Sequence, residues 1–258
     1  MPVPKIKFQE MTLEENIDII KWAYFEGNDV LEVHNYTIQY FPQLANLDAK
    51  LSREKICKII EEVVTNEYGK FIEKIKQEVE RYSILWSHYN DEYFEKLSLY
   101  LDVTWPNSLK EINCSIGLIP VFPRNLDDYS FSIGININDL QLLEICAHET
   151  LHFLWFEKWM QIYSETSRAE FDSPYLVWQY SEMVTDPILN SEPFLNMFDF
   201  VERSYDSFYE ITDGDTNIID NLRNIYASNK SINEKIKTGF GYIKKVFDDT
   251  IPEKITRK

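Results

Sequence analysis

The sequence His148-Glu149-Thr150-Leu151-His152 places two histidines four positions apart, with a glutamate directly after the first. Successive residues of an α-helix turn by about 100°, so His148 and His152 lie one turn apart on one face. Two imidazoles at this spacing can reach one Zn²⁺ ion. Glu149 lies about 100° around the helix from His148, where it can hold a metal-bound water and take its proton. The spacing therefore predicts a metal-binding helix in which Glu149 is the catalytic base.

The segments before this motif predict a strand–strand–helix unit. Asn138, with Gln141 three positions later, forms a capping box, so we expect a helix over residues 139–160. Apolar residues alternate with polar ones over residues 112–122 and 129–137, which is typical of strands. We therefore expect a small sheet directly before the metal-binding helix.

The rest of the chain favours helices, because glycine is rare, with 7 in 258 residues, and Glu, Lys, Leu and Ile are abundant. Thr12 with Glu15, and Ser52, are the predicted caps of the first two long helices. We expect helices over residues 13–25, 53–101 with a break near Tyr68-Gly69, 174–185, 194–209, 217–228 and 232–247, and either a helix or a strand over 29–40. The predicted fold is α+β and mainly helical. A helical N-terminal region, residues 1–107, precedes a second domain, residues 108–258.

Composition excludes several classes of function. The chain has a net charge of −17. Nucleic-acid binding and adhesion to an anionic membrane need a basic surface, which so acidic a composition does not predict. Cys57, Cys114 and Cys146 are widely separated and odd in number, which predicts no disulfide framework. No signal peptide and no apolar run of about 20 residues is found. We therefore expect a cytoplasmic protein that binds neither nucleic acid nor membrane.

A catalytic zinc site needs a third protein ligand. His34 and His88 lie far upstream, so we expect a carboxylate downstream of His152. The candidates are Glu157, Glu165, Glu170, Asp172, Glu182 and Asp186.

The segment Ser181-Glu182-Met183-Val184-Thr185-Asp186 resembles the Asn-Glu-x-x-Ser-Asp sequence of gluzincin metallopeptidases of the thermolysin type, with Ser181 in place of Asn and Thr185 in place of Ser. The resemblance implies that Glu182 is the third zinc ligand. It also implies that Asp186, in the second shell of the metal, accepts a hydrogen bond from the other ring nitrogen of His148. Glu170 remains the alternative ligand.

Local signals bound the helix that carries these carboxylates. Ser173 and Pro174 predict its N-cap and first residue, and Asp186-Pro187 predicts its end. Glu182 and Asp186 would then share one face of a short helix.

The resemblance also implies a zincin-like fold, in which a small twisted sheet lies over the active-site helix. By chain order, residues 112–119 would be the edge strand that pairs with a bound peptide, and residues 129–137 the strand inside it. The alternative is a simple hairpin that packs on the helix.

The implied activity is that of a zinc metallopeptidase, which hydrolyses peptide bonds with a zinc-activated water and a glutamate base. Its partner would be a peptide or protein substrate. Gluzincins use a His or Tyr well beyond the Glu ligand to stabilise the oxyanion, and no histidine follows His152. Tyr242 is the candidate here, because its neighbours Gly239 and Gly241 would let the main chain approach the cleft closely. Tyr180, Tyr205, Tyr209 and Arg203 are alternatives.

Two other classes of function remain open. One is a zinc protein without peptidase activity whose N-terminal helices bind a partner. The other is a zinc hydrolase of a non-peptide amide. The substrate and the oligomeric state stay open.

Overall fold

The computed structural model describes residues 3–26, 33–45, 47, 50–118 and 123–250. The chain forms two compact units, each built from separate segments. The sheet unit comprises Pro4–Asn90 and Ser108–Leu142. The helical unit comprises Met1–Val3, Asp91–Asn107 and Leu143–Lys258. The mainly helical α+β class is thus confirmed, while the domains 1–107 and 108–258 stay a prediction.

The sheet unit is built on a four-stranded mixed sheet with strand order β1-β2-β4-β3. Its strands are β1 (Lys5–Glu10), β2 (Glu111–Gly117), β3 (Arg124–Asn125) and β4 (Ser130–Gly134). The first three neighbours in the sheet, β1, β2 and β4, run parallel, and β3 pairs antiparallel with β4. The register aligns Phe8 with Cys114 and Cys114 with Phe131, so buried side chains of three strands lie in one row.

The strand predicted as the edge of the sheet is an inner strand. β2 has β1 on one side and β4 on the other, and β2 and β4 run parallel rather than forming a hairpin. No strand was predicted at residues 5–10, where only Ile6 and Phe8 are apolar. Pairing with β2 nevertheless makes this segment a strand, and it takes the edge that was predicted to be free.

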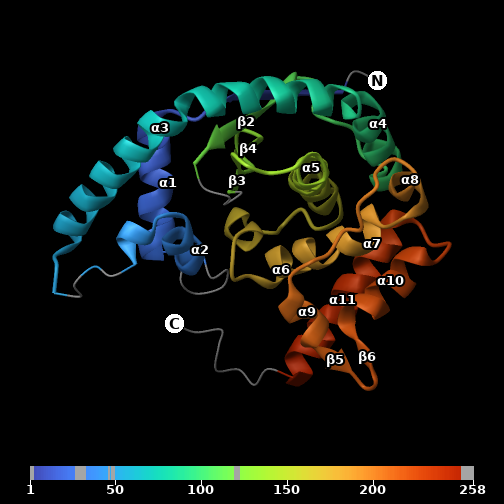
Figure 1. Ribbon diagram of the computed structural model, residues 1–258. Helices are drawn as coiled ribbons and strands as arrows, with labels where there is room; N and C mark the ends of the chain where they lie inside the picture. Colours follow the sequence, from blue (N-terminus) through green and yellow to red (C-terminus); the bar gives the residue numbers. More distant parts are fainter. Residues whose placement is uncertain (1–2, 27–32, 46, 48–49, 119–122, 251–258) are drawn as a thin grey trace. The chain divides into compact units, whose positions relative to one another are not determined.

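Three helices pack within the sheet unit: α1 (Leu13–Glu26), α2 (Val33–Tyr40) and α3 (Arg53–Ser87) (Figure 1). Helix α1 begins at the predicted capping box, in which Thr12 and Glu15 bond each other's main-chain N–H. Helix α3 contacts α1, β1 and β2. The break predicted near Gly69 was wrong. One helical glycine costs only about 1 kcal/mol, and burial of Ile60, Val64, Ile75, Tyr82 and Trp86 outweighs it.

The helical unit carries the C-terminal half of the chain. Its elements are α4 (Asn90–Leu101), α5 (Asp139–Ile162, from Leu143 onward), η2 (Arg168–Phe171), α6 (Leu176–Met183), α7 (Thr185–Leu189), α8 (Glu192–Leu195), α9 (Asp206–Glu210), β5 (Thr212–Asp213), β6 (Thr216–Asn217), α10 (Ile218–Ala227) and α11 (Ile232–Thr250). The Tyr93 hydroxyl of α4 donates to the Ala147 carbonyl of α5 at 2.6 Å. Helix α6 meets α10 and α11 through Tyr180, whose hydroxyl bonds the Tyr226 hydroxyl at 3.0 Å and the Ile236 carbonyl at 3.2 Å.

Two predicted helices of this unit differ from the structure. The helix predicted over 174–185 begins at Leu176, and Tyr175 rather than Ser173 is its N-cap. Pro187 does not end it, because a second helix, α7, follows and holds Pro187 in its first turn, where no N–H is needed. The helix predicted over 194–209 is replaced by α8 and α9, with an irregular segment between them.

Within the described part of the chain, no helix combines the length and the hydropathy that crossing a membrane requires. Cys57, Cys114 and Cys146 are free thiols.

Candidate metal centre

Helix α5 presents the two histidines as their spacing predicts. It begins at the predicted capping box, in which the Asn138 side chain accepts from the Gln141 N–H at 2.9 Å and the Gln141 side chain accepts from the Asn138 N–H at 3.1 Å. The Nε2 atoms of His148 and His152 lie 3.1 Å apart. His152 is fully buried, while a fifth of the His148 side chain is exposed. The two rings therefore aim their Nε2 atoms at one point.

Glu182 of α6 completes the group. Its Oε2 atom lies 3.3 Å from His148 Nε2 and 3.5 Å from His152 Nε2, and its side chain is buried. His148, His152 and Glu182 are together a group that could hold a metal ion. Glu170, the alternative third ligand, instead forms the capping box of η2, where its side chain accepts from the Ser167 N–H.

The spacing of the three donor atoms fits zinc. Tetrahedral zinc with bonds of about 2.0–2.1 Å sets its ligand atoms about 3.3–3.4 Å apart. The observed separations of 3.1, 3.3 and 3.5 Å have that size. Two histidines and one carboxylate are also the donor set of catalytic zinc sites, which keep one position for water or substrate.

Charge in this region also favours a cation. Glu149, Glu182 and Glu202 are all buried, and buried carboxylates are costly unless they are paired. Burial lowers the pKa of His148, but Glu202 and Glu182 more than offset this and raise it well above its usual value. Burial and the charge of Glu202 raise the pKa of Glu144. The buried negative charge is thus concentrated where the two histidines converge.

The hydrogen-bond partner of His148 is Glu202, not Asp186. His148 Nδ1 lies 2.7 Å from Glu202 Oε1, close enough to donate its proton there and to keep Nε2 free for a metal. The resemblance to gluzincins assigned this contact to Asp186. Glu202 was missed because it lies in the segment predicted to be a helix, residues 194–209, and belongs to no recognised motif.

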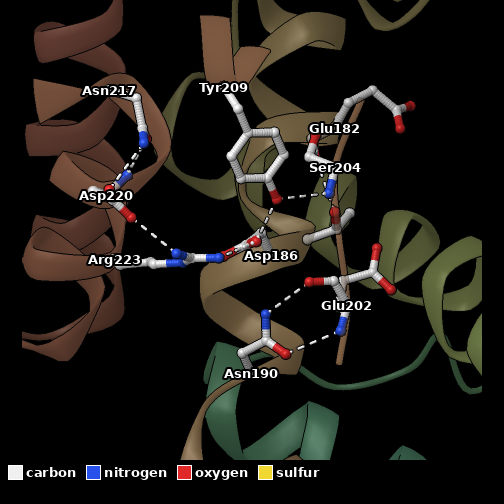
Figure 2. A network of polar contacts seen from close by, with 10 residues as sticks. Glu182, Asp186, Asn190, Glu202, Ser204, Tyr209, Asn217, Asp220 and Arg223 are labelled. Atoms are coloured by element: carbon white, nitrogen blue, oxygen red, sulfur yellow. Dashed lines mark hydrogen bonds and ion pairs between the residues drawn. The ribbon is translucent and has the colours of Figure 1, made fainter. Parts of the chain in front are cut away.

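Asn190, just after α7, holds the main chain of Glu202 (Figure 2). The Asn190 side-chain oxygen accepts from the Glu202 N–H at 3.0 Å, and its NH₂ group donates to the Glu202 carbonyl at 2.9 Å. The amide therefore binds both polar groups of one residue, as a neighbouring strand would.

Asp186 is fully buried and belongs to a different cluster (Figure 2). Arg223 of α10 donates to its two carboxylate oxygens at 2.7 and 2.8 Å, and the Tyr209 hydroxyl donates at 2.5 Å. The Ser204 N–H donates to the same Tyr209 hydroxyl, and the Ser204 hydroxyl donates to the Glu182 carbonyl at 2.9 Å. Asp186 is thus linked to the main-chain carbonyl of Glu182 through Tyr209 and Ser204.

The structure also places the other predicted residues. Glu149 is buried on α5 beside His148. Tyr242 of α11 is partly buried, and its hydroxyl accepts from the Asn221 side chain at 2.7 Å. Burial raises its pKa. The oxyanion role of Tyr242 stays a prediction.

The alternatives to Tyr242 are engaged elsewhere. Tyr180 is buried against α10 and α11, as described above, and Tyr209 bonds Asp186. Arg203 pairs with Asp206 at 3.0 Å and lies over the Tyr209 ring. Tyr205 is 40% exposed.

The chain matches no protein-family model, no curated protein and no solved structure. The function proposed below therefore rests on the geometry of the candidate metal centre.

Proposed function

We propose that this chain is a zinc-dependent metallopeptidase of the gluzincin kind. The observation that carries the proposal is the triangle of His148 Nε2, His152 Nε2 and Glu182 Oε2, with sides of 3.1–3.5 Å. These three residues would hold Zn²⁺. A buried general base, Glu149, lies beside the first of them in sequence.

The chemistry divides between the metal and the chain's own residues. Zinc, when bound, supplies a Lewis acid that lowers the pKa of water and polarises a carbonyl. Glu149 accepts the proton of the attacking water and passes it to the leaving amine. Glu202 holds the His148 ring in place through Nδ1. A catalytic base distinguishes this site from a purely structural one, which needs none.

The substrate class follows from the same proposal. We propose a peptide or protein substrate and a zincin-like fold. We also propose a cytoplasmic location, because three free thiols are compatible with a reducing compartment.

A metal analysis combined with a peptide-library digest tests the proposal. The wild type should carry one zinc ion per chain and cleave library peptides. Glu149→Gln should keep the zinc and lose about 10²–10⁴-fold in kcat, the usual contribution of a general base. Glu165→Gln, which changes an exposed glutamate just after α5, is the matched control and should change neither quantity. His148→Ala should lose both.

Other results would point elsewhere. A wild type without bound metal would refute the zinc site, and full activity in Glu149→Gln would refute the mechanism. Stoichiometric zinc without peptide cleavage would favour a zinc-binding protein of another kind or a hydrolase of non-peptide amides.

A further inference from the structure

Helix α6 carries two buried residues that have different partners. Glu182 lies with His148 and His152 in the candidate metal centre. Tyr180, two positions earlier, contacts α10 and α11, which lie beside α6 in the helical unit (Figure 1). Because the two residues belong to one short helix, any movement of the main chain at Tyr180 also moves Glu182.

The Tyr180 hydroxyl is held by two hydrogen bonds. It donates to the Ile236 carbonyl of α11 at 3.2 Å. A hydroxyl has one proton, so the Tyr226 hydroxyl of α10, 3.0 Å away, is the donor in the bond between the two phenols. Burial raises the pKa of both tyrosines, so both keep the protons that these bonds need. The tip of the Tyr180 side chain therefore has a defined place between α10 and α11.

The Tyr180 ring is also enclosed by other aromatic rings. Its centroid lies 5.8 Å from the Trp155 ring and 6.2 Å from the Trp159 ring, both on α5, and 5.6 Å from the Phe240 ring on α11. Trp155 lies three positions after His152 on α5, which is less than one helical turn. An interior packed this closely transmits a displacement. A shift of the Tyr180 ring should therefore reach the main chain of α6.

Gly239 of α11 leaves the room that the Tyr180 side chain occupies. A Cβ atom at this buried position would overlap the Tyr180 hydroxyl oxygen, and it would lie 3.2 Å from Tyr180 Cζ and from Leu222 Cδ2. Glycine is a poor helix former, and only proline is worse. The close approach of the tyrosine explains why a glycine stands inside α11 at this position.

We infer that Tyr180 and Gly239 are positioning residues, which set where Glu182 meets a bound metal ion. Gly239 lets α11 approach the Tyr180 ring, and the ring holds α6. Metal–ligand distances tolerate only about 0.2 Å, so a small shift of α6 is enough to change how Glu182 Oε2 meets the ion. The inference rests on the zinc site of the proposed function and not on peptide cleavage.

Gly239→Ala tests the contact directly. The added methyl group should displace the Tyr180 ring, so zinc affinity should fall about 10–100-fold, as for the loss of other groups that orient a ligand. Competition with a chromophoric chelator measures the affinity. Gly241→Ala is the matched control, because a Cβ there would meet no neighbouring element within 4 Å in the described structure. Its zinc affinity should stay within about twofold of wild type.

A second substitution should reverse the effect of the first. Tyr180→Phe removes the oxygen that the new methyl group would overlap. The double variant Gly239→Ala/Tyr180→Phe should therefore bind zinc more tightly than Gly239→Ala alone, a coupling that independent sites do not show. Tyr180→Phe by itself loses the bond to the Ile236 carbonyl, and its zinc affinity should fall about 3–10-fold.

Cobalt distinguishes positioning from a general loss of stability. Co²⁺ bound in place of zinc has visible absorption bands that depend on the number and arrangement of its ligands. We expect these bands to change in Gly239→Ala and to match the wild type in Gly241→Ala. A variant that is only less stable, but folded, would keep the wild-type bands, because its bound ion would have the same ligands.

Several outcomes would overturn the inference. One is a folded Gly239→Ala variant with wild-type zinc affinity and cobalt bands, and another is an equal loss in Gly239→Ala and Gly241→Ala. A double variant that binds zinc no more tightly than Gly239→Ala would also overturn it. If Gly239→Ala does not fold, Tyr180→Phe decides, since wild-type affinity there refutes the role and a loss with changed cobalt bands supports it.

The metal site and the peptidase can be judged separately. A wild type that binds zinc but cleaves no peptide would leave the positioning role standing and overturn only the peptidase. A wild type that binds no metal would overturn both.

Discussion

His148 Nδ1 and Glu202 Oε1 lie 2.7 Å apart, although the two residues are 54 positions apart in the chain. This contact orients the imidazole so that Nε2 faces His152 and Glu182. A carboxylate on the far nitrogen also makes the ring a better metal ligand. The orientation of one histidine of the candidate metal centre thus depends on a residue that no motif identifies.

Glu202→Ala should weaken zinc affinity about 10–100-fold, because His148 loses the group that fixes its ring. Glu202→Gln should lose less, since its amide oxygen can still accept from Nδ1. Competition with a chromophoric chelator measures both constants. Asp199→Ala, which removes the same charge from an exposed site of the same segment, is the control and should bind zinc as the wild type does. Unchanged affinity in Glu202→Ala would refute the role.

Asp186→Asn should lower the free energy of unfolding by about 2–4 kcal/mol, because Arg223 and Tyr209 lose a buried charged partner. The lower end is expected, since 42% of the Arg223 side chain is exposed and can turn to water. Urea unfolding of the zinc-free protein measures the change. Asp220→Asn removes the exposed partner of the same arginine and should cost less than about 1 kcal/mol.

The zinc affinities of these variants distinguish two arrangements. We expect Asp186→Asn to weaken zinc binding less than Glu202→Ala does. The reverse order would support the assignment of Asp186 that the gluzincin pattern implies.

Removal of zinc should destabilise the protein. A ligand that binds only the folded state, at about 1,000 times its Kd, adds about 4 kcal/mol to the free energy of unfolding. Urea unfolding with zinc and with EDTA should show a difference of that size in the wild type and none in His148→Ala. Equal stability of the wild type in both conditions would count against a zinc site at His148, His152 and Glu182.

Tyr242→Phe tests the predicted oxyanion donor. Loss of such a donor lowers kcat about 10²–10³-fold, and we expect KM to change little. Asn221→Ala removes the observed partner of the Tyr242 hydroxyl but keeps the phenol, so its kcat should stay within about threefold of wild type. If kcat is unchanged in Tyr242→Phe, the tyrosine only packs α11 against α10.

Features that depend only on residues close together in the sequence could be predicted from the sequence. The capping boxes at Thr12 and Asn138 are bonds between residues three positions apart, and both occur. The convergence of His148 and His152 follows from helix geometry alone. These features need no knowledge of the rest of the fold.

Contacts between distant segments could not be predicted in the same way. The strand at Lys5–Glu10 exists because it pairs with β2, about a hundred residues later. Glu202 looks like a surface residue until Asn190 and His148 are placed beside it. At Phe198–Tyr205, a buried Glu and a buried Ser interrupt the apolar pattern that would have marked an extended segment.

The order of the chain gives the Asp186–Arg223 contact a further meaning. A ribosome releases His148 and His152 first, then Glu182 and Asp186, later Glu202, and only afterwards Arg223. The three donor atoms therefore emerge before the groups that orient and anchor them. A nascent chain without α10 has the three residues of the candidate metal centre but lacks the arginine that pairs with the buried Asp186. The buried carboxylate of Asp186 therefore has no arginine partner until α10 has been synthesised.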